Sequence, residues 1–397
     1  MNREDFPILE DDVVFLDNGA TTLKPEVVID KMNDYYFHYT SNIHRGEYDY
    51  SIKANYEYDQ VREKVSKFIH CDKDSVIFTS GATLSLNMIV FGYMRNHLKK
   101  GDVVLLNKGE HASNVLPWIK LSEEIGIIIQ YVPLNKDYSL SLDSIKKCVN
   151  DSVKVISLSH ITNVMGDVRD IHSIGKFCHE KGIIFVVDAS QSVPHKKFDF
   201  IGDSVDFLAF SGHKMCGPTG VGVLVGRREL LENMEPFIYG GGMNSFFEED
   251  NSYEYKKVPF KFEAGTPAIA EVIGLGSSID YLMSIGMDKI EEHELKLKKY
   301  FLSQVKDIPN LILYNSHTKS GIIDFNIDGV FAQDVAIYLN HYHICVRAGN
   351  HCAKLLKDDM NVKNTVRASF YFYNDYLDVD RFVDALKKSK DIFKVVL

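Results

Sequence analysis

The stretch Phe207-Leu208-Ala209-Phe210-Ser211-Gly212-His213-Lys214 indicates the fold of this chain. Its first half is apolar, as is typical of a buried strand, and its polar residues follow where that strand would end. Upstream, the apolar run 183–187 ends in Asp188-Ala189-Ser190-Gln191. Buried strands that end in polar residues are typical of parallel sheets, where ligands bind at the carboxyl ends of the strands. We therefore expect Asp188 and Lys214 to face one pocket.

Short β-rich runs alternate with helical segments between about residues 76 and 225. This alternation predicts an α/β fold, with a mostly parallel seven-stranded sheet covered by helices on both faces. The turn at Gly81 also follows one of these runs, so the same pocket can include it. The runs lie at 76–79, 103–106, 127–132, 153–158, 183–187, 207–210 and 221–225.

The rest of the chain predicts a second, smaller α/β unit. Residues 240–263 are irregular and predict a hairpin or excursion, and a long helix from about Val272 should break near Gly286. Strands such as 322–327, a helix over 332–341 and a last helix over 379–393 follow. We expect a large domain over residues 20–280 and a small domain over 281–397, with segment 1–19 packing near the small domain.

Composition excludes several classes of protein. The chain has 397 residues and a net charge of -10, which argues against nucleic-acid binding as its main function. No apolar stretch reaches the roughly 18 to 20 residues of a membrane span, and the acidic N-terminus has no apolar signal region, so we expect a cytoplasmic protein. The six cysteines form no C-x-x-C pair, which argues against a zinc ribbon or a dithiol redox motif.

Asp188 and Lys214 together are what a pyridoxal phosphate site requires. The lysine binds the aldehyde of the cofactor, and the acid pairs with the protonated pyridine nitrogen. Most lysines are solvated surface charges, which is the alternative for Lys214. That alternative is disfavoured because Lys214 follows a buried-type strand and precedes the turn Gly217-Pro218-Thr219-Gly220.

Two further segments add candidate cofactor contacts. Thr79-Ser80-Gly81-Ala82-Thr83 predicts a turn into a helix, where backbone N–H groups and hydroxyls can hold a phosphate, although such residues can also serve as a helix cap. Ser211 and His213 flank the lysine and can contribute. His111 follows the run 103–106 and can stack on the pyridine ring and move protons; the alternative is a helix cap with a solvated imidazole.

These segments, in this order, resemble the group II cysteine desulfurases, which belong to the class V aminotransferase branch of the fold type I pyridoxal phosphate enzymes. That group includes the SufS type and the selenocysteine lyases. The chain departs from the family pattern at Ala112 and Asn350, where histidines are usual. The matching segments are Phe15 to Thr22, Asn42-Ile43-His44-Arg45-Gly46, Ser211 to Lys214, Phe262 to Pro267 and Val346 to Ala353.

The resemblance implies a role for each matched residue. It implies Lys214 as the lysine that carries the cofactor and His111 as the stacking histidine. It implies a further set of cofactor contacts at Ala82, Thr83, Asn163, Asp188, Gln191, Ser211, His213 and Thr266. Because Thr266 would reach the phosphate of the other subunit, the resemblance also implies a homodimer with shared sites. Arg367 would bind the substrate carboxylate, with Arg347 and Asn163 beside the substrate.

Cys352 would decide the reaction. It lies in a polar loop between Arg347 and Arg367, and nearby cations favour the reactive thiolate. The resemblance implies conversion of L-cysteine to L-alanine with a persulfide on Cys352. The sulfur would pass to an acceptor, either a SufU- or SufE-like protein or an iron–sulfur scaffold, for cluster assembly or thiolation.

Several alternatives remain open at this point. Cys352 could be a buried inert thiol, or a metal ligand together with His341, His343 and His351, although we favour no metal. The activity could be that of a selenocysteine lyase, or of an aminotransferase that needs no cysteine. A catalytically silent scaffold would need neither Lys214 nor Cys352.

Overall fold

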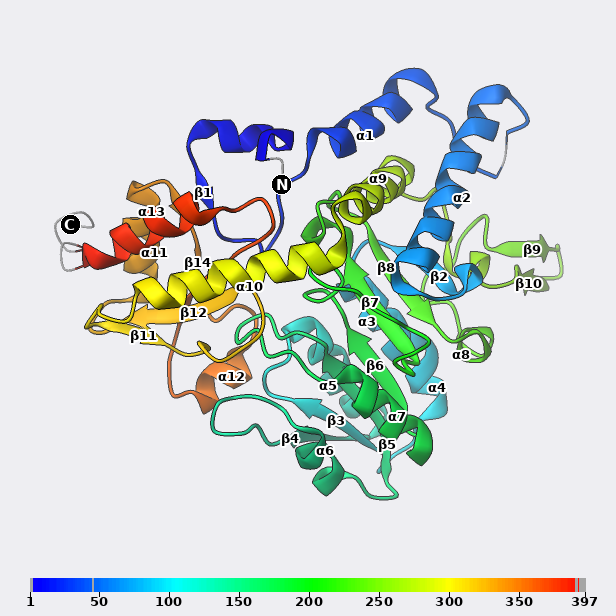
Figure 1. Cartoon of the computed structure of the whole chain (residues 1–397). Helices are drawn as coiled ribbons and strands as arrows, with labels where there is room; N and C mark the ends of the chain where they lie inside the picture. Colours follow the sequence, from blue (N-terminus) through cyan, green and yellow to red (C-terminus); the bar gives the residue numbers. More distant parts are fainter. Residues whose placement is uncertain (1–2, 45, 390–391, 393–397) are drawn as a thin grey trace.

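The computed structural model describes residues 3–44, 46–389 and 392 (Figure 1). Arg45 of the Asn42–Gly46 segment and part of the predicted C-terminal helix, including Phe393, lie outside the described residues. Within them, the last helix is α13 (Tyr376–Lys387), which begins at the N-cap Asp375. The Asp375 carboxylate accepts from the backbone N–H of Asp378, so the first turn of α13 is capped by a side chain.

The large sheet contains all seven predicted strands, in the order β2-β8-β7-β6-β5-β3-β4. Strands β3 to β7 pair in parallel, whereas β8 is antiparallel to both β2 and β7. The prediction of a mostly parallel seven-stranded sheet is therefore confirmed. The strands are β2 (Val76–Thr79), β3 (Val103–Asn107), β4 (Ile128–Val132), β5 (Val153–Ser159), β6 (Ile184–Asp188), β7 (Phe207–Ser211) and β8 (Gly222–Gly226).

Helices cover both faces of this sheet because alternate strand residues enter two separate apolar cores. One core includes side chains of α2 (Asp49–Ile69), α7 (Ile171–Lys181) and α9 (Ile269–Ile285). The other includes side chains of α3 (Ala82–Met88) and α5 (Leu116–Ile125). The remaining elements of this part are α1 (Glu26–His38), a π-helix (Ile89–Met94), α4 (Arg95–His97), α6 (Leu142–Cys148) and α8 (Arg228–Glu232).

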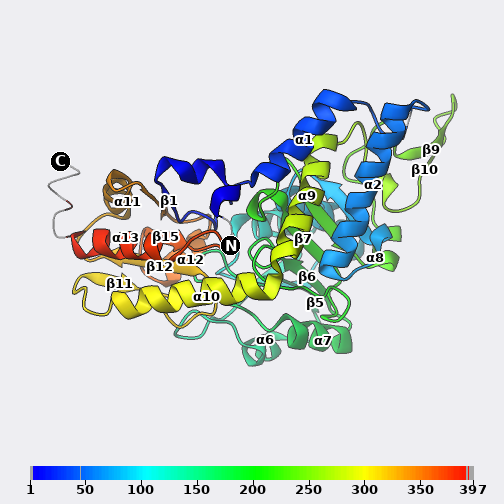
Figure 2. The ribbon, with the colours of Figure 1, turned by 45° about the horizontal axis from the view of Figure 1, so that its top comes forward.

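The chain passes from the large sheet to the small sheet through a helix break at Gly286. Here the chain turns by 73° between α9 and α10 (Met287–Gln304), at a glycine with a φ of 94°. Such a φ is rare for residues with a Cβ, which explains the predicted break. Figures 1 and 2 show α10, in yellow, running from the large sheet along the small one. In the described part of the chain, no single helix is long and apolar enough to cross a membrane; only the bent pair α9 and α10 has enough length and apolar character together.

The small sheet is antiparallel, in the order β11-β12-β15-β14. Its apolar core includes side chains of α10, α11 (Ala332–His341) and α13. The strands are β11 (Leu311–Leu313), β12 (Ile322–Ile327), β14 (Arg347–Gly349) and β15 (Thr365–Ser369). The helix α12 (Lys354–Asp359) lies between β14 and β15 in the chain.

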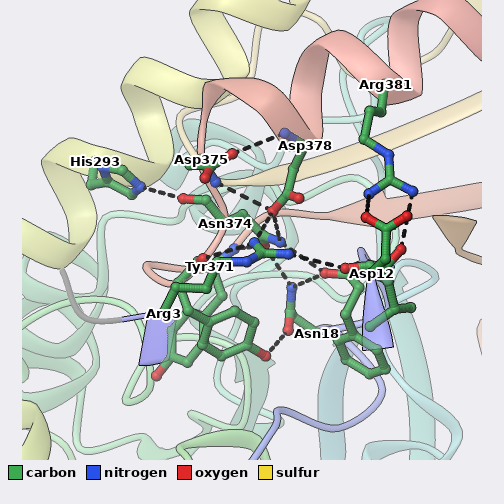
Figure 3. A network of polar contacts seen from close by, with 12 residues as sticks. Arg3, Asp12, Asn18, His293, Tyr371, Asn374, Asp375, Asp378 and Arg381 are labelled. Carbon is green, nitrogen blue, oxygen red and sulfur yellow. Dashed lines mark hydrogen bonds and ion pairs between the residues drawn. The ribbon is translucent and has the colours of Figure 1, made fainter. Parts of the chain in front are cut away.

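The N-terminal segment lies against the small sheet and α13 (Figure 3). Its strand β1 (Val14–Phe15) pairs in parallel with β13 (Ile344–Cys345). Arg3 donates to the Asp378 carboxylate at 2.8 Å, and Arg381 donates to Asp12 at the same distance. These contacts hold the segment in place just before the chain enters the pocket at Gly19.

The predicted excursion is a hairpin of two short strands, β9 (Asn244–Phe247) and β10 (Tyr253–Tyr255). It projects from the large sheet, and most of its residues are exposed.

Candidate active site

A pocket of about 200 Å³ lies at the carboxyl ends of the large sheet. It is lined from both sides, because residues after β3, β5, β6 and β7 meet Arg347 and Arg367 of the small sheet there. All the predicted site residues except Thr266 and Cys352 line it. They are Ala82, Thr83, His111, Asn163, Asp188, Gln191, Ser211, His213, Lys214, Arg347 and Arg367.

Lys214 ends a short 3-10 turn that directly follows β7, as the sequence predicted. The carbonyl of its neighbour His213 accepts from the Thr22 N–H and the Thr21 hydroxyl, both at 3.0 Å, so the turn is held from the N-terminal segment. Burial lowers the pKa of Lys214 to about 8, against the opposing influence of Asp188. The amine is therefore far easier to deprotonate than that of a surface lysine.

The predicted phosphate turn is shaped by close contact between two glycines. Gly81 has a φ of 153°, and a Cβ on Gly222 of β8 would lie 2.4 Å from the Cα of Gly81. The Ser211 hydroxyl oxygen accepts from the Ala82 N–H at 2.9 Å, which leaves its own proton available for donation. Thr83 is exposed, and its hydroxyl lies 2.8 Å from that of Ser113. Hydroxyl and N–H donors thus surround one end of the pocket.

His111 combines the two alternatives that the sequence left open. It is an N-cap, because its Nδ1 accepts from the Ser113 N–H at 3.2 Å, and it also lines the pocket. The alternative of a solvated imidazole is not supported, because burial, aided by Lys214, lowers the pKa of His111 to about 4. The ring is therefore neutral near pH 7, with its proton on Nε2.

Arg367 is almost fully buried, at 1% exposure, beside the N-terminal segment. It donates to the Asn163 carbonyl at 2.9 Å and to the Asp17 carboxylate at 3.2 Å. A Cβ on Gly19 would lie 3.0 Å from its Cζ, so the guanidinium would have to shift by a few tenths of an ångström if this residue had a side chain. Desolvation raises the pKa of Asp17, which Arg367 opposes. A guanidinium held in this way can bind a substrate carboxylate with its remaining N–H groups.

Cys352 lies outside the lining of the pocket, in the loop before α12. Its side chain is exposed, whereas the other five cysteines are buried or partly buried, so the inert buried thiol is excluded. Its carbonyl accepts from the Ala112 N–H at 2.8 Å, next to His111. Both His351 and Cys352 have positive φ values, of 53° and 58°. Such backbone is unfavourable for these residue types and is often found at functional sites.

Thr266 is not brought to the pocket. It is exposed near the hairpin, where its hydroxyl accepts from the Asn42 side chain at 3.3 Å. A contact with the cofactor of the same subunit is therefore not supported, and only the implied contact across a dimer remains open.

The sequence prediction missed His351 as a pocket residue. Its Nε2 lies 3.1 Å from the Thr365 carbonyl, so it must donate there, and its buried Nδ1 has no hydrogen-bond partner. Burial lowers the pKa of His351 to about 2, so the ring is neutral. The Arg367 Nε and the Asn163 Oδ1 are also buried without partners. Because buried polar atoms are rarely left unpaired, three of them among the residues of one pocket indicate a polar ligand.

The metal alternative has no support within the described residues, which include His341, His343, His351 and Cys352. Those residues contain no group of three or more His, Cys, Asp or Glu side chains placed to hold a metal ion. The pocket instead fits pyridoxal phosphate. An amine of lowered pKa is available for an aldehyde, an acid at a strand end is available for a pyridinium, and donors are available for a phosphate.

Comparison with known proteins gives the family. The family model for class V aminotransferases matches residues 14–382. The chain is 40% identical to a protein of Halalkalibacterium halodurans named "Probable cysteine desulfurase", over 98% of this chain and 97% of that one. The chain belongs to the cysteine desulfurase family.

Solved structures of cysteine desulfurases agree with this assignment. The enzyme from Thermococcus onnurineus superposes with a TM-score of 0.94 at 34% identity, covering 98% of this chain and 96% of that one. The cysteine desulfurase CsdA from Escherichia coli superposes with a TM-score of 0.93 at 33% identity, covering 98% of both chains. The family and fold that the sequence motifs implied are therefore confirmed.

Proposed function

We propose that this cysteine desulfurase family member binds pyridoxal phosphate and converts L-cysteine to L-alanine, leaving the sulfur as a persulfide on Cys352. One observation carries the proposal: an amine of lowered pKa and a buried arginine face one pocket, with an exposed cysteine in the adjoining loop. The close similarity to cysteine desulfurases over nearly the whole chain supports it. Turnover is tested by assaying alanine and sulfide from L-cysteine, with a Lys214→Ala control.

Residues of the large sheet would hold the cofactor. Asp188 would pair with the pyridine nitrogen, Gln191 would contact the phenolic oxygen, and His111 would stack on the ring. Ala82, Thr83, Ser211 and His213 would bind the phosphate. When bound, pyridoxal phosphate supplies an electron sink for the bond broken at the substrate Cα. Asn163 and Arg347 would lie beside the cofactor and substrate.

The chain's own groups would then move the protons and the sulfur. Arg367 binds the substrate carboxylate and so orients the Cα–H bond toward Lys214, which removes that proton in its neutral form. The Cys352 thiolate attacks the substrate sulfur. The S–S bond forms as the C–S bond breaks, and the electron pair of the C–S bond remains on the carbon fragment. That fragment becomes alanine after protonation; His111, which lines the same pocket, is a candidate to relay this proton.

The exposure of Cys352 favours transfer of the sulfur to another protein, because a persulfide on an exposed loop can be reached by a second thiol. The acceptor would be a SufU- or SufE-like protein or an iron–sulfur scaffold. The sulfur would then enter iron–sulfur clusters or a thiolation pathway. Transfer is tested by mixing the persulfidated protein with each type of acceptor and following loss of sulfane sulfur from Cys352.

A homodimer with shared sites is part of the proposal. Large apolar side chains are exposed on α1, α2, the segment after α8 and the β9–β10 hairpin, and exposed apolar patches mark interfaces. They include Phe37 (76%), Tyr50, Tyr56, Tyr239 and Phe247 (68%). Thr266 lies beside the hairpin, where it could reach the partner's phosphate. A monomeric mass in light scattering would contradict this arrangement.

Two finer points of classification belong to the same proposal. The exposed Cys352 loop is consistent with group II membership. The two sheets, separated at the break near Gly286, are consistent with a large domain over 20–280 and a small domain over 281–397 that the segment 1–19 joins. Limited proteolysis that released a fragment cut near residue 281 would support this division.

Selenocysteine lyase activity is the second candidate, because the same pocket would accept selenocysteine. Selenium leaves more easily than sulfur, so that activity should depend less on Cys352. An aminotransferase would not need Cys352 at all. Comparing Cys352→Ala on cysteine and selenocysteine distinguishes the three activities.

A further inference from the structure

A buried ion pair lies behind the pocket and has no part in the chemistry proposed above. The Lys357 Nζ is 3.2 Å from the Asp324 carboxylate, and both side chains are fully buried. Thr365 completes the cluster, since its hydroxyl donates to Asp324 and accepts from Lys357, each at 2.5 Å. Charged side chains are almost never fully buried unless they are paired, because removing them from water is costly.

The position of Asp324 connects this pair to the substrate arginine. Asp324 on β12 lies directly opposite Arg367 on β15, and Arg347 on β14 lies opposite Arg367 on its other side. Residues opposite one another in an antiparallel pair point to the same face of the sheet, with Cβ atoms about 5 Å apart. Asp324 is therefore a second carboxylate within reach of Arg367, in addition to Asp17.

Lys357 limits the attraction between these two groups. Both Lys357 and Arg367 stabilise the Asp324 carboxylate against burial, and Lys357 has the larger influence. Arg367 is thereby left to its contacts with Asn163 and Asp17 on the pocket side. If Lys357 were neutral, the uncompensated charge of Asp324 would compete with these pocket-side contacts for the Arg367 guanidinium.

The same lysine anchors the loop that carries Cys352. Lys357 belongs to α12, which begins two residues after Cys352, and it ties that helix to β12 and β15. His351 meets the same cluster through the Thr365 carbonyl, at 3.1 Å. The buried polar contacts of Lys357 and Thr365 thus support the left-handed backbone of His351 and Cys352.

We propose that Lys357 and Asp324 form a positioning pair, which keeps Arg367 directed into the pocket and holds the Cys352 loop in place. The inference rests on the proposed function, because it takes Arg367 to bind the carboxylate of cysteine. It assigns a role to residues that touch neither substrate nor cofactor.

A charge-cancelling cycle of variants tests the pair in the cofactor-loaded protein. Lys357→Met should raise the KM for L-cysteine about tenfold or more, because Asp324 then competes with the substrate for Arg367. The double variant Lys357→Met with Asp324→Asn removes both charges and should return KM to within about threefold of the wild type. Lys357→Gln replaces Lys357→Met if the latter does not fold, with the same expectation.

The matched control is Lys354→Met, which removes a lysine from the same helix. Lys354 is 65% exposed and pairs with the exposed Asp358, so KM should not change. A second readout needs no turnover: the rate of Cys352 alkylation in protein freed of cofactor. That rate should change about threefold or more in Lys357→Met and remain unchanged in Lys354→Met.

The outcomes distinguish failure of the positioning pair from failure of the proposed function. A KM within twofold of the wild type in Lys357→Met, or a double variant as impaired as Lys357→Met, would overturn the positioning pair. Wild-type protein that forms no alanine from cysteine would instead overturn the proposed function, and the alkylation contrast would still test the anchoring of the loop.

Discussion

The side-chain amide of Asn163 donates a 2.7 Å hydrogen bond to the carbonyl of His351, one residue before Cys352. The Asn163 carbonyl in turn accepts from Arg367 at 2.9 Å. Asn163, a single residue in the loop after β5, thus joins two parts of the site. One is Arg367, expected to hold the substrate carboxylate, and the other is the Cys352 loop, expected to take the sulfur. The spacing between these two ends of the pocket depends on it.

Asn163→Ala is therefore expected to impair both ends of the reaction. Loss of the amide frees the His351 carbonyl, and loss of side-chain packing loosens the Arg367 contact, so kcat/KM should fall by roughly 10- to 100-fold. Steady-state kinetics with L-cysteine measure this. Asn233→Ala is the control, because the Asn233 side chain makes a similar bond to a carbonyl, at 2.7 Å, but lies exposed after α8. Equal kinetics in the two variants would contradict the role of Asn163.

The lowered pKa of Lys214 predicts how the cofactor-free protein takes up pyridoxal phosphate. Only a neutral amine attacks an aldehyde, so the rate should rise with pH up to about 8 and then level off. A lysine with an ordinary pKa near 10.4 would give a rate that keeps rising through pH 9. Stopped-flow absorbance between pH 6.5 and 9.5 separates the two profiles.

Selective alkylation should identify Cys352 as the accessible thiol. Burial raises the pKa of Cys71, Cys178 and Cys216 to about 12, so these thiols should react far more slowly. A short treatment with iodoacetamide at pH 7.5, followed by peptide mapping, should label the peptide with Cys352 first. Activity should fall in step with that label. Earlier labelling of any buried cysteine would contradict the described loop.

Much of the fold could be predicted because its signals are local. Each strand of the large sheet is a short apolar run with clear ends, and the break between α9 and α10 is marked by Gly286. The site residues at strand ends, such as Asp188 and Lys214, followed from the same pattern. The apolar runs and the polar residues at their ends were therefore enough to place these site residues.

The rest of the site depends on contacts between distant segments, which periodicity does not reveal. Asp17 meets Arg367 only where the N-terminal segment packs against the small sheet, and His351 meets Thr365 only where the loop after β14 lies against β15. The sequence predicts His111 as either a cap or a ring-stacking group, although one imidazole can cap with Nδ1 and still line the pocket. The Lys357–Asp324 pair carries no sequence motif at all.

Gly19→Ala tests the close approach of the N-terminal segment to Arg367. The added Cβ would lie 3.0 Å from the guanidinium carbon, which is buried and has little room to move. We expect KM for L-cysteine to rise about tenfold, with the melting temperature lowered by only a few degrees. An unchanged KM would show that the Arg367 guanidinium can shift without weakening its binding of the substrate carboxylate.

Buried Lys298 predicts a pH dependence of stability outside the site. It donates to two carbonyls and to Thr318, and burial lowers its pKa to about 7. Between that value and about 10.4 the unfolded chain binds the extra proton, so the free energy of unfolding should rise with pH, by at most about 1.4 kcal/mol per unit. Denaturant melts at pH 7 and pH 9 should show this rise.

The comparison for that rise is a pair of neighbouring variants on α10. Lys298→Met should remove the rise in stability between pH 7 and pH 9, whereas Lys299→Met, at an exposed position, should retain it. An equal rise in both variants would show that other groups cause the pH dependence.

In the proposed reaction, the Cys352 thiolate takes the sulfur of the substrate. Mass spectrometry of the protein treated with L-cysteine, in the absence of reductant, tests it most directly. The peptide containing Cys352 should become heavier by one sulfur atom as alanine appears, and Cys352→Ser should form neither the adduct nor alanine at the wild-type rate. Alanine formed at the wild-type rate without any adduct on Cys352 would contradict it.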